Sequence, residues 1–391
     1  MPVINRIAAF HEEMIAWRQD IHRNPETAFE EHRTAAFVAQ QLEGFGLEVR
    51  RGLAGTGVVA TLRAGSGARA IALRADLDAL HIQEKNALPY TSCVPGKMHA
   101  CGHDGHTAML LGAAKYLAET RKFDGVVHFV FQPAEENEGG GRVMVEQGLF
   151  DQFPCEAIYG MHNWPGMPVG QFAIRPGPMM ASYDVFEIVV EGRGSHGAMP
   201  HQSIDPVVAA AQIVLGLQTI VSRNVKPIDA AVVSVTQIHG GDTWNVIPES
   251  VVLRGTTRCF RRDVRDQMER RIGEIAAGIA SAMGATATLR YERRYPALVN
   301  QDEAVRRAAA AARDIVGDPA KVEMEIEPVM GSEDFAFMLE RKPGAYIMIG
   351  NGGGEGGRML HNARYDFNDA ILPIGASYWA RLVEQSLAAA A

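Results

Sequence analysis

The chain has 391 residues, which is more than one hydrophobic core usually supports, so we expect two domains. Apolar residues make up 47% of the chain and charged residues 21%, the balance of an ordinary globular protein. The net charge is −8 and no long basic run occurs, which argues against nucleic acid as a partner. No apolar stretch approaches the length of a transmembrane helix, so we expect no membrane association.

The N-terminal segment and the cysteines both bear on the compartment. The segment from Met1 to Arg23 is amphipathic and contains acidic residues, and it lacks the apolar core and cleavage site of a signal peptide. The four cysteines are scattered without the spacing of a disulfide framework. We therefore predict a cytoplasmic protein, in which a notable cysteine is more often a ligand or a nucleophile than half of a disulfide.

Short apolar strands alternate with helical patterns in the first 175 residues. The expected helices run from Arg6 to Arg23, Glu31 to Gly44 and Thr107 to Thr120, and the expected strands from Gly57 to Leu62, Ala70 to Leu73, Val126 to Phe131 and Ala157 to Tyr159. Near-continuous apolar strands between helices indicate an α/β fold with a mostly parallel central sheet covered by helices.

The pattern changes near Ser182 and returns after Tyr295, where we expect a helix from Asp302 to Val316 and another that starts at Ser332. Residues 183–191 alternate polar and apolar side chains, which is typical of a half-solvated antiparallel strand. Asp205 and Pro206 provide a cap and a first-turn proline for a long helix. The order strand, helix, strand, strand, helix, strand over residues 183–295 is ferredoxin-like and α+β. The α/β domain thus comprises residues 1–182 and 296–391, interrupted by this insert.

Possible metal ligands gather in one segment and after several strands. Met98 to His106 contains one thiol and three imidazoles, and thiolate, imidazole and carboxylate groups are the ligands of zinc and related metals. Further polar groups follow the predicted strands at positions 76, 78, 135, 136, 162 and 361. Sites in open α/β sheets form beyond the carboxyl ends of the strands, so we expect these groups to meet.

Spacing assigns roles only in part. Cys101 and His103 would point to one side of an extended loop, but spacing alone does not choose among His99, His103 and His106. Glu135 and its neighbour Glu136 cannot easily point the same way. One can bind metal while the other acts as a general base, which is the minimum for metal-assisted hydrolysis. For Asp76 and Asp78, a capped or solvated strand end is as good an interpretation as a role in the site.

Eight segments together resemble one enzyme family. They are RADLDAL, HACGHDGHTAMLLGAA, FQPAEENEGGG, GMHNWP, GSHGAMPH, NVIPESV, GSEDF and LHNARYDFND, and they occur in the family's order from about Trp17 to Trp379. The chain resembles the hippurate hydrolase/N-acyl-L-amino-acid amidohydrolase branch of the aminoacylase–carboxypeptidase metallohydrolase superfamily. The set of segments is specific, although no single segment is.

The resemblance implies a catalytic domain split by a smaller lid domain that also dimerises, so we expect a homodimer or a higher homo-oligomer. It implies two divalent metal ions per subunit, zinc in the first place because of the thiolate, with manganese, cobalt or nickel as alternatives. Glu135 becomes the general base. The implied metal ligands are Cys101, His103, Glu136, His162 and His361.

The comparison with the family also covers three lid residues and two departures from the wider superfamily. The resemblance makes His196 the group that stabilises the tetrahedral oxyanion, and Asn245 and Arg258 the groups that hold the substrate's carboxylate or amide oxygen. Many superfamily members have His-x-Asp where this chain has Asp76 and Asp78, and a bridging aspartate where it has Cys101. We expect Asp78 to orient a ligand rather than to bind metal.

The preferred function is metal-dependent hydrolysis of N-acyl-L-amino acids to a carboxylic acid and an amino acid, by metal-activated water with Glu135 as the base. A dipeptidase or carboxypeptidase on the same scaffold is the alternative, since only the acyl pocket would differ. A metal-free hydrolase with Cys101 as nucleophile would leave Glu136, His162 and His361 without a role. A non-catalytic metal-binding or sensor protein would bind metal without turnover.

Overall fold

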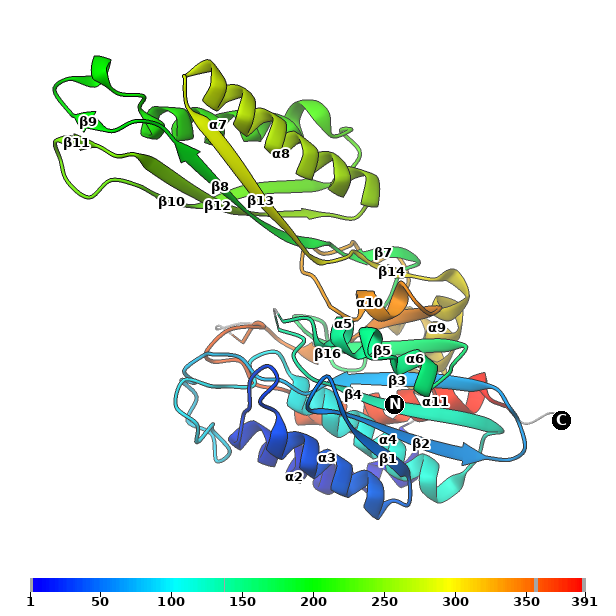
Figure 1. The fold of residues 1–391 in the computed structure, drawn as a ribbon. Helices are drawn as coiled ribbons and strands as arrows, with labels where there is room; N and C mark the ends of the chain where they lie inside the picture. Colours follow the sequence, from blue (N-terminus) through cyan, green and yellow to red (C-terminus); the bar gives the residue numbers. More distant parts are fainter. Residues whose placement is uncertain (1–2, 137, 355–357, 389–391) are drawn as a thin grey trace. The chain divides into compact units, whose positions relative to one another are not determined.

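The computed structural model describes residues 3–136, 138–354 and 358–388 (Figure 1). The chain forms two compact units. Unit 1 comprises the chain up to Gly177, Val299–Glu327 and Asp334 onward, and unit 2 comprises Pro178–Leu298 and Pro328–Glu333. One segment in the middle of the sequence thus makes up nearly all of unit 2.

Within the described residues, unit 1 is built around an eight-stranded sheet. Its four central strands, in the order β4, β3, β5, β16, are mutually parallel, and β2 joins β4 in antiparallel pairing. In sheet order the strands are β1 (Glu48–Leu53), β2 (Gly57–Ala64), β4 (Gly125–Gln132), β3 (Ala70–Asp76), β5 (Ala157–Pro165), β16 (Gly344–Gly352), β6 (Phe172–Ala173) and β15 (Val322–Glu323). Strands β3 and β4 are buried along their whole length, as their continuous apolar sequences predict.

Helices surround this sheet. The long helices α2, α3 and α4 lie on one side of the sheet in Figure 1, and the short helices α5, α6 and α10 on the other, while α11 packs between α4 and α9. The helices are α1 (Asn5–Ala8), α2 (His11–Arg23), α3 (His32–Gly44), α4 (His103–Thr120), α5 (Gly140–Glu146), α6 (Leu149–Gln152), α9 (Asp302–Val316), α10 (Ala336–Leu339) and α11 (Leu372–Ser386). The predicted α/β class with a mostly parallel sheet is confirmed.

Several predicted boundaries were wrong. The N-terminal helix is interrupted at Ala9 and Phe10, and only the four residues of α10 are helical where a helix was expected from Ser332. Helix α4 begins at His103 instead of Thr107, and β5 runs on to Pro165. The last two differences place one candidate metal ligand on the first turn of a helix and another inside a strand.

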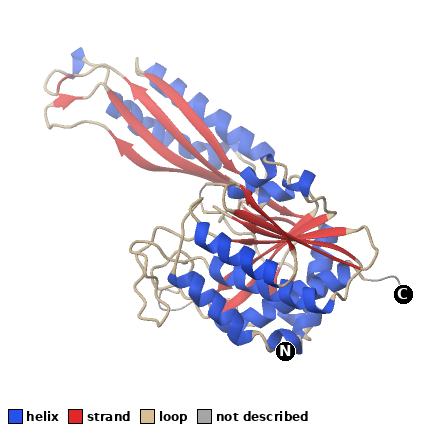
Figure 2. Ribbon diagram, turned by 60° about the horizontal axis from the view of Figure 1, so that its bottom comes forward, coloured by secondary structure: helices blue, strands red, loops and turns tan. Residues whose placement is uncertain are grey.

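Unit 2 is a ferredoxin-like layer of strands and helices (Figure 2). Its antiparallel sheet has the order β10 (Ala231–His239), β12 (Ser250–Cys259), β8 (Tyr183–Glu191), β13 (Thr286–Tyr295). Helices α7 (Pro206–Thr219) and α8 (Arg262–Ala282) pack together on one face. Asp205 caps α7 through the Val207 amide, as its sequence predicts. The remaining strands of the described residues are short: β7 (Gly177–Met180), β9 (Ser195–His196), β11 (Val246–Ile247) and β14 (Leu298–Asn300).

The expectation that no stretch is long and apolar enough to cross a membrane needs a correction. Residues Pro206–Asn224 meet that requirement by length and composition. In unit 2, however, Ala209, Ala210, Ile213 and Leu217 from this stretch belong to the hydrophobic core formed with the sheet and α8. A core helix of a globular domain passes the same length test, so this stretch is weak support for a membrane span.

Candidate active site

A sharp turn at Gly102 sets the positions of Cys101 and His103. Gly102 has φ +99°, and a Cβ atom there would lie 2.2 Å from the side-chain nitrogen of Asn163 and 2.5 Å from the hydroxyl of Tyr365. Only glycine combines this left-handed conformation with such close packing. Cys101 therefore ends the incoming loop and His103 starts α4, so the predicted extended loop through both residues is wrong.

Cys101, His103 and His162 direct ligand atoms toward one another. The Cys101 Sγ atom lies 3.3 Å from His162 Nε2, and one potential ligand atom from each of the three residues lies within 4.8 Å of the others. His162 Nδ1 lies 2.6 Å from the carbonyl oxygen of Asn163, and His103 Nδ1 lies 2.8 Å from that of Asp78. Each Nδ1–H thus donates to a carbonyl, so Nε2 is the nitrogen of each ring that can bind a metal.

The fit of these residues to a metal can be tested on His103. Its Nε2 atom is buried and has no hydrogen-bond partner among the described residues. It lies 3.8 Å from Asp76 Oδ2, which is beyond hydrogen-bond distance. A buried imidazole nitrogen without a partner is costly unless an ion or water occupies the space in front of it. The donor set of thiol, imidazoles and carboxylates therefore suits zinc or a neighbouring metal.

Glu136 and His361 form a second group around Cys101. His361 Nε2 lies 3.0 Å from Glu136 Oε1, and ligand atoms of these two residues and of Cys101 lie within 4.8 Å of one another. His361 has φ +61° and its amide donates to the carbonyl oxygen of Ala100 at 2.7 Å. This hydrogen bond joins the loop after β16 to the residue before Cys101. The two groups share the Cys101 sulfur, so two closely spaced ions fit the arrangement.

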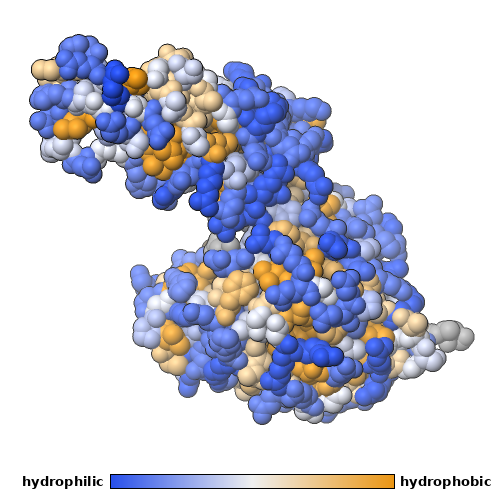
Figure 3. Space-filling model, in the orientation of Figure 1, coloured by the Kyte–Doolittle hydropathy of each residue, from blue (hydrophilic) through white to orange (hydrophobic). Residues whose placement is uncertain are grey.

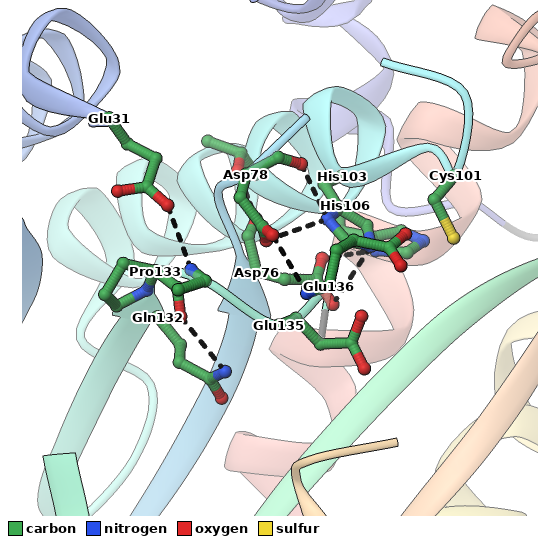
Figure 4. A network of polar contacts seen from close by, with 12 residues as sticks. Glu31, Asp76, Asp78, Cys101, His103, His106, Gln132, Pro133, Glu135 and Glu136 are labelled. Carbon is green, nitrogen blue, oxygen red and sulfur yellow. Dashed lines mark hydrogen bonds and ion pairs between the residues drawn. The ribbon is translucent and has the colours of Figure 1, made fainter. Parts of the chain in front are cut away.

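Glu135 and Glu136 diverge, as their adjacency predicts (Figure 4). The Glu136 amide donates to Asp78 Oδ2 at 2.9 Å, whereas Glu135 Oε1 accepts from the Asp334 amide at 3.4 Å. Both carboxylates stay close to His103, because ligand atoms of all three residues lie within 4.8 Å of one another. A buried carboxylate thus lies beside the candidate metal ligands without sharing the direction of Glu136.

The electrostatics of the cluster distinguish its ligands. Burial and the carboxylates of Glu136 and Glu135 raise the pKa of the Cys101 thiol well above its usual value. A nucleophilic cysteine needs the opposite shift, so a metal-free cysteine hydrolase is disfavoured. Burial and the nearby imidazole of His106 hold the pKa of His162 well below its usual value, which keeps that ring neutral, as a ligand must be.

Two other carboxylates raise the pKa of His103. Burial alone would lower its pKa, but Asp76 and Asp78 raise it to about 10. A cation that binds His103 must therefore displace a proton, so binding at this position releases protons into solution.

His106 and Asp76 support the cluster from behind. His106 Nδ1 donates to Asp76 Oδ1 at 2.6 Å, and His106 Nε2 accepts from the backbone amide of Asn163 at 3.0 Å. Both ring nitrogens are thereby used. Asp78, through its contacts with His103 and Glu136, orients two candidate ligands at once. The contacts of Asp76 and Asp78 indicate that these residues support the candidate metal ligands. They argue against the capped or solvated strand end that the sequence also allowed.

The sequence did not predict one buried polar network. Arg74 donates to Asp76 Oδ2 at 2.7 Å, to Gln132 Oε1 at 2.8 Å and to Asp334 Oδ1 at 3.0 Å, and all four side chains are buried. Asn163 is a second omission, because its side chain donates to the Cys101 carbonyl at 2.6 Å. In the sequence, the only indication of these residues was that they lie in the family-like segments RADLDAL, FQPAEENEGGG, GMHNWP and GSEDF.

His99 has no comparable role in the described structure. It is buried, both its ring nitrogens lack hydrogen-bond partners among the described residues, and burial lowers its pKa to about 4. From the spacing alone, His99 was as good a candidate for a metal ligand as His103 and His106. It belongs to none of the groups whose ligand atoms gather around Cys101 within the described chain.

The three lid candidates lie in two parts of unit 2. His196 in β9 pairs with Val246 in β11, and the Gly197 amide donates to the Asn245 carbonyl at 2.7 Å, so His196 and Asn245 are neighbours. His196 is exposed. Arg258 lies elsewhere, in β12, with its guanidinium 4.2 Å from the ring centre of Tyr183. Partial burial lowers the pKa of Arg258.

Comparison with known proteins decides the family. The sequence model of peptidase family M20/M25/M40 matches residues 72–385. The chain belongs to this family. Within M20, it is 42% identical to hippurate hydrolase from Campylobacter jejuni over 98% of each chain, and 39% identical to N-acetylcysteine deacetylase from Bacillus subtilis over 96% of this chain and 97% of that protein.

A solved M20 structure resembles the whole chain. It is a Bacillus subtilis protein described as a dinuclear metal-binding peptidase, with a TM-score of 0.85, 36% identity and coverage of 97% of this chain and 99% of the other. The predicted hippurate hydrolase branch and the amidohydrolase class are confirmed. Together with the ligand groups around Cys101, this neighbour supports two metal ions.

Proposed function

We propose that this M20 enzyme hydrolyses the amide bond of N-acyl-L-amino acids, hippurate among them, to a carboxylic acid and a free amino acid. The observation that carries the proposal is the position of the Glu135 carboxylate beside the two ligand groups that share Cys101. The names of two relatives, hippurate hydrolase and N-acetylcysteine deacetylase, support an acyl group on the amino acid's nitrogen.

Five residues would hold the two divalent ions: Cys101, His103, Glu136, His162 and His361. Such ions supply a Lewis acid and lower the pKa of a coordinated water toward neutrality. We assign Cys101 as the shared ligand because its sulfur belongs to both groups. Zinc suits the thiolate best, with manganese, cobalt and nickel as alternatives.

Glu135 performs the proton transfers. Its carboxylate takes a proton from the attacking water as the new C–O bond forms, and later delivers this proton to the nitrogen as the amide C–N bond breaks. The hydrogen bond from the Asp334 amide fixes one of its oxygens. Burial of the carboxylate keeps bulk water from competing for the proton.

The residues of unit 2 would bind the substrate. His196 stabilises the oxyanion of the tetrahedral intermediate, since its ring Nδ1 accepts from the Ala198 amide and Nε2 can carry the donor hydrogen. Arg258 suits the substrate's carboxylate, because its planar fork donates two parallel hydrogen bonds. Asn245 holds the carboxylate or the amide oxygen.

We further propose that unit 2 forms a homodimer or a larger homo-oligomer. Apolar side chains are exposed on it, as the space-filling view illustrates (Figure 3). They come from α7 and the π-helical turn that follows it, from the edge strand β10, and from β11 and the loops near β9 and β11: Met199, Val207, Val208, Leu215, Val221, Ile238, Trp244 and Val246. The absence of disulfides among the four cysteines supports the cytoplasmic location that we propose.

A substrate panel tests the proposal. The metal-reconstituted enzyme is given benzoyl-, acetyl- and aminoacyl-derivatives of the same amino acids, and release of the amino acid is measured. We expect kcat/KM to be higher for the benzoyl or acetyl derivatives. A preference for substrates with a free α-amine on the acyl side would instead identify a dipeptidase or carboxypeptidase.

A further inference from the structure

Glu31 is a buried carboxylate outside the candidate ligand set. It lies between α2 and α3, and its side chain has no solvent exposure. Its Oε1 atom accepts hydrogen bonds from the amides of Phe29 at 3.1 Å and Ala134 at 2.9 Å, and its Oε2 atom accepts from the Thr56 hydroxyl at 2.6 Å. Figure 4 shows this carboxylate reaching the loop that carries Glu135 and Glu136.

Ala134 has an unfavourable backbone conformation. Its φ is +53°, in the left-handed region that a residue with a Cβ atom rarely adopts. Ala134 immediately precedes Glu135, so its conformation sets the direction in which the two glutamates leave the end of β4. A strained residue of this kind persists only when surrounding contacts hold it.

The loop is held from both ends. Glu31 binds the amide of Ala134, and two residues later Asp78 binds the amide of Glu136 at 2.9 Å. The carbonyl oxygen of Ala134 accepts from the Gly140 amide at 2.8 Å, so both polar groups of this residue are fixed. Asp78 also holds His103, whereas Glu31 makes no hydrogen bond to a candidate metal ligand within the described residues.

We propose that Glu31 is a positioning residue, which holds Ala134 in the left-handed conformation and thereby directs Glu135 and Glu136 to their separate places. The inference rests on the proposed roles of Glu135 as base and Glu136 as metal ligand. Glu31 itself touches neither substrate nor metal. It acts on the reaction only through the backbone of the loop.

The acceptor oxygens of Glu31, not its charge, make these contacts. All three donors are neutral, and no cation pairs with Glu31 within the described residues. Burial and the nearby carboxylate of Asp78 also raise the pKa of Glu31, to about 7. A glutamine can keep Oε1 on both backbone amides while its Nε2 donates to the Thr56 hydroxyl, which can accept as well as donate.

Three variants of the metal-loaded enzyme test the inference. Glu31→Ala removes the acceptor, and we expect kcat to fall about 100-fold, the effect of a misplaced catalytic group. Glu31→Gln should keep kcat within about threefold of the wild type, because the acceptors remain. Glu31→Ala combined with Ala134→Gly should recover roughly tenfold in kcat, since glycine adopts the left-handed conformation without strain.

Thr56→Val is the matched control. It removes a buried partner of Glu31 and leaves the bond to Ala134, so it should lower the melting temperature while kcat stays within about threefold. A loss of kcat in Thr56→Val as large as that in Glu31→Ala would show that general destabilisation suffices. Equal losses in Glu31→Gln and Glu31→Ala, or no recovery with Ala134→Gly, would also overturn the inference.

Two readouts do not need turnover. Hydrogen exchange of the amides around residue 134 should accelerate in Glu31→Ala but not in Glu31→Gln, and zinc affinity should weaken about 10–100-fold in Glu31→Ala, the effect of losing an outer partner of a ligand. Unchanged exchange and affinity would contradict positioning by Glu31. If the wild-type enzyme cleaved no acyl-amino acid, the proposed function would fail, while these two measurements would still decide the role of Glu31.

Discussion

The Cys101 sulfur lies 3.3 Å from the Nε2 atom of His162, although 61 residues separate the two in sequence. The contact joins the end of the loop before α4 to β5. The thiol and the imidazole nitrogen face each other in a buried space, and the other imidazole nitrogen is bonded to a carbonyl oxygen. This arrangement fits the metal site that we propose better than a catalytic cysteine–histidine pair. The carboxylates beside the thiol strengthen this assignment, because they oppose a free thiolate.

Replacing Cys101 tests its role as the shared ligand. Cys101→Ser should weaken metal binding by roughly 100-fold or more, since even outer partners of a ligand cost 10–100-fold. Metal content after dialysis, measured by mass spectrometry, provides the readout. Cys155→Ser is the control, because Cys155 is also buried and free but lies outside the site. Full retention of two ions in Cys101→Ser would refute the shared-ligand role.

Replacing Glu135 separates catalysis from metal binding. Glu135→Gln should lower kcat by about 10²–10⁴-fold, the contribution of a general base, and leave the metal content unchanged. Glu138→Gln in the same loop is the control, because Glu138 is exposed and should not affect turnover. Steady-state kinetics on benzoylglycine, with metal analysis of the same samples, gives both quantities. Wild-type kcat in metal-loaded Glu135→Gln would exclude this residue as the base.

His22, a buried residue of α2, predicts how the free energy of unfolding depends on pH. Burial alone would lower the pKa of His22, but its hydrogen bonds with Asp104 and Glu84 raise it to about 9. The folded state therefore keeps a proton that the unfolded state loses above about pH 6.5. This stabilisation is complete below pH 6.5 and disappears as the pH rises through 9. Its size is on the order of 3 kcal/mol.

The measurement is the free energy of unfolding against pH, in chelator, for the wild type and His22→Gln. We expect the wild-type free energy to decrease more steeply between pH 6.5 and 9 than that of the variant. The chelator removes the pH dependence of metal binding from both curves. Parallel curves would show that His22 is not protonated in the folded protein at neutral pH.

Removing a buried arginine should cost more free energy of unfolding than removing an exposed one, and Arg74 allows this comparison. Arg74→Ala leaves Asp76 and Asp334 buried without their cation, so we expect a loss of about 3–5 kcal/mol in the free energy of unfolding. Arg254→Ala breaks an ion pair with Glu187 in which the arginine is half-exposed, and should cost less than about 1 kcal/mol. Urea unfolding of both variants measures the difference. Equal costs would mean that the Arg74 network does not stabilise unit 1.

Much of the fold followed from the sequence. Apolar strands such as β4 and the alternating strand β8 have distinct patterns, and the structure has strands at both places. The predicted helix from Asp302 to Val316 matches α9 residue for residue, because its apolar face repeats at the helical period. The proximity of Glu136 and His361, which follow different strands, agrees with the rule that sites form beyond the carboxyl ends of parallel strands.

The remainder depends on contacts between distant residues. The left-handed turn at Gly102 is required by the packing of Asn163 and Tyr365, so no local pattern could move the start of α4 from Thr107 to His103. The pairing of Arg74 with Asp334 is likewise a property of the folded sheet. Spacing could not choose between His103 and His106 either, because the choice depends on which ring nitrogens are already bonded.

Metal titration tests whether two bound ions support amide hydrolysis by this enzyme. The enzyme is stripped with a chelator and titrated with Zn²⁺ or Mn²⁺ while hydrolysis of benzoylglycine is followed. We expect no hydrolysis by the stripped enzyme and a rise in activity that saturates at two ions per chain. Full activity in chelator, or two bound ions without turnover of any acyl-amino acid, would contradict it.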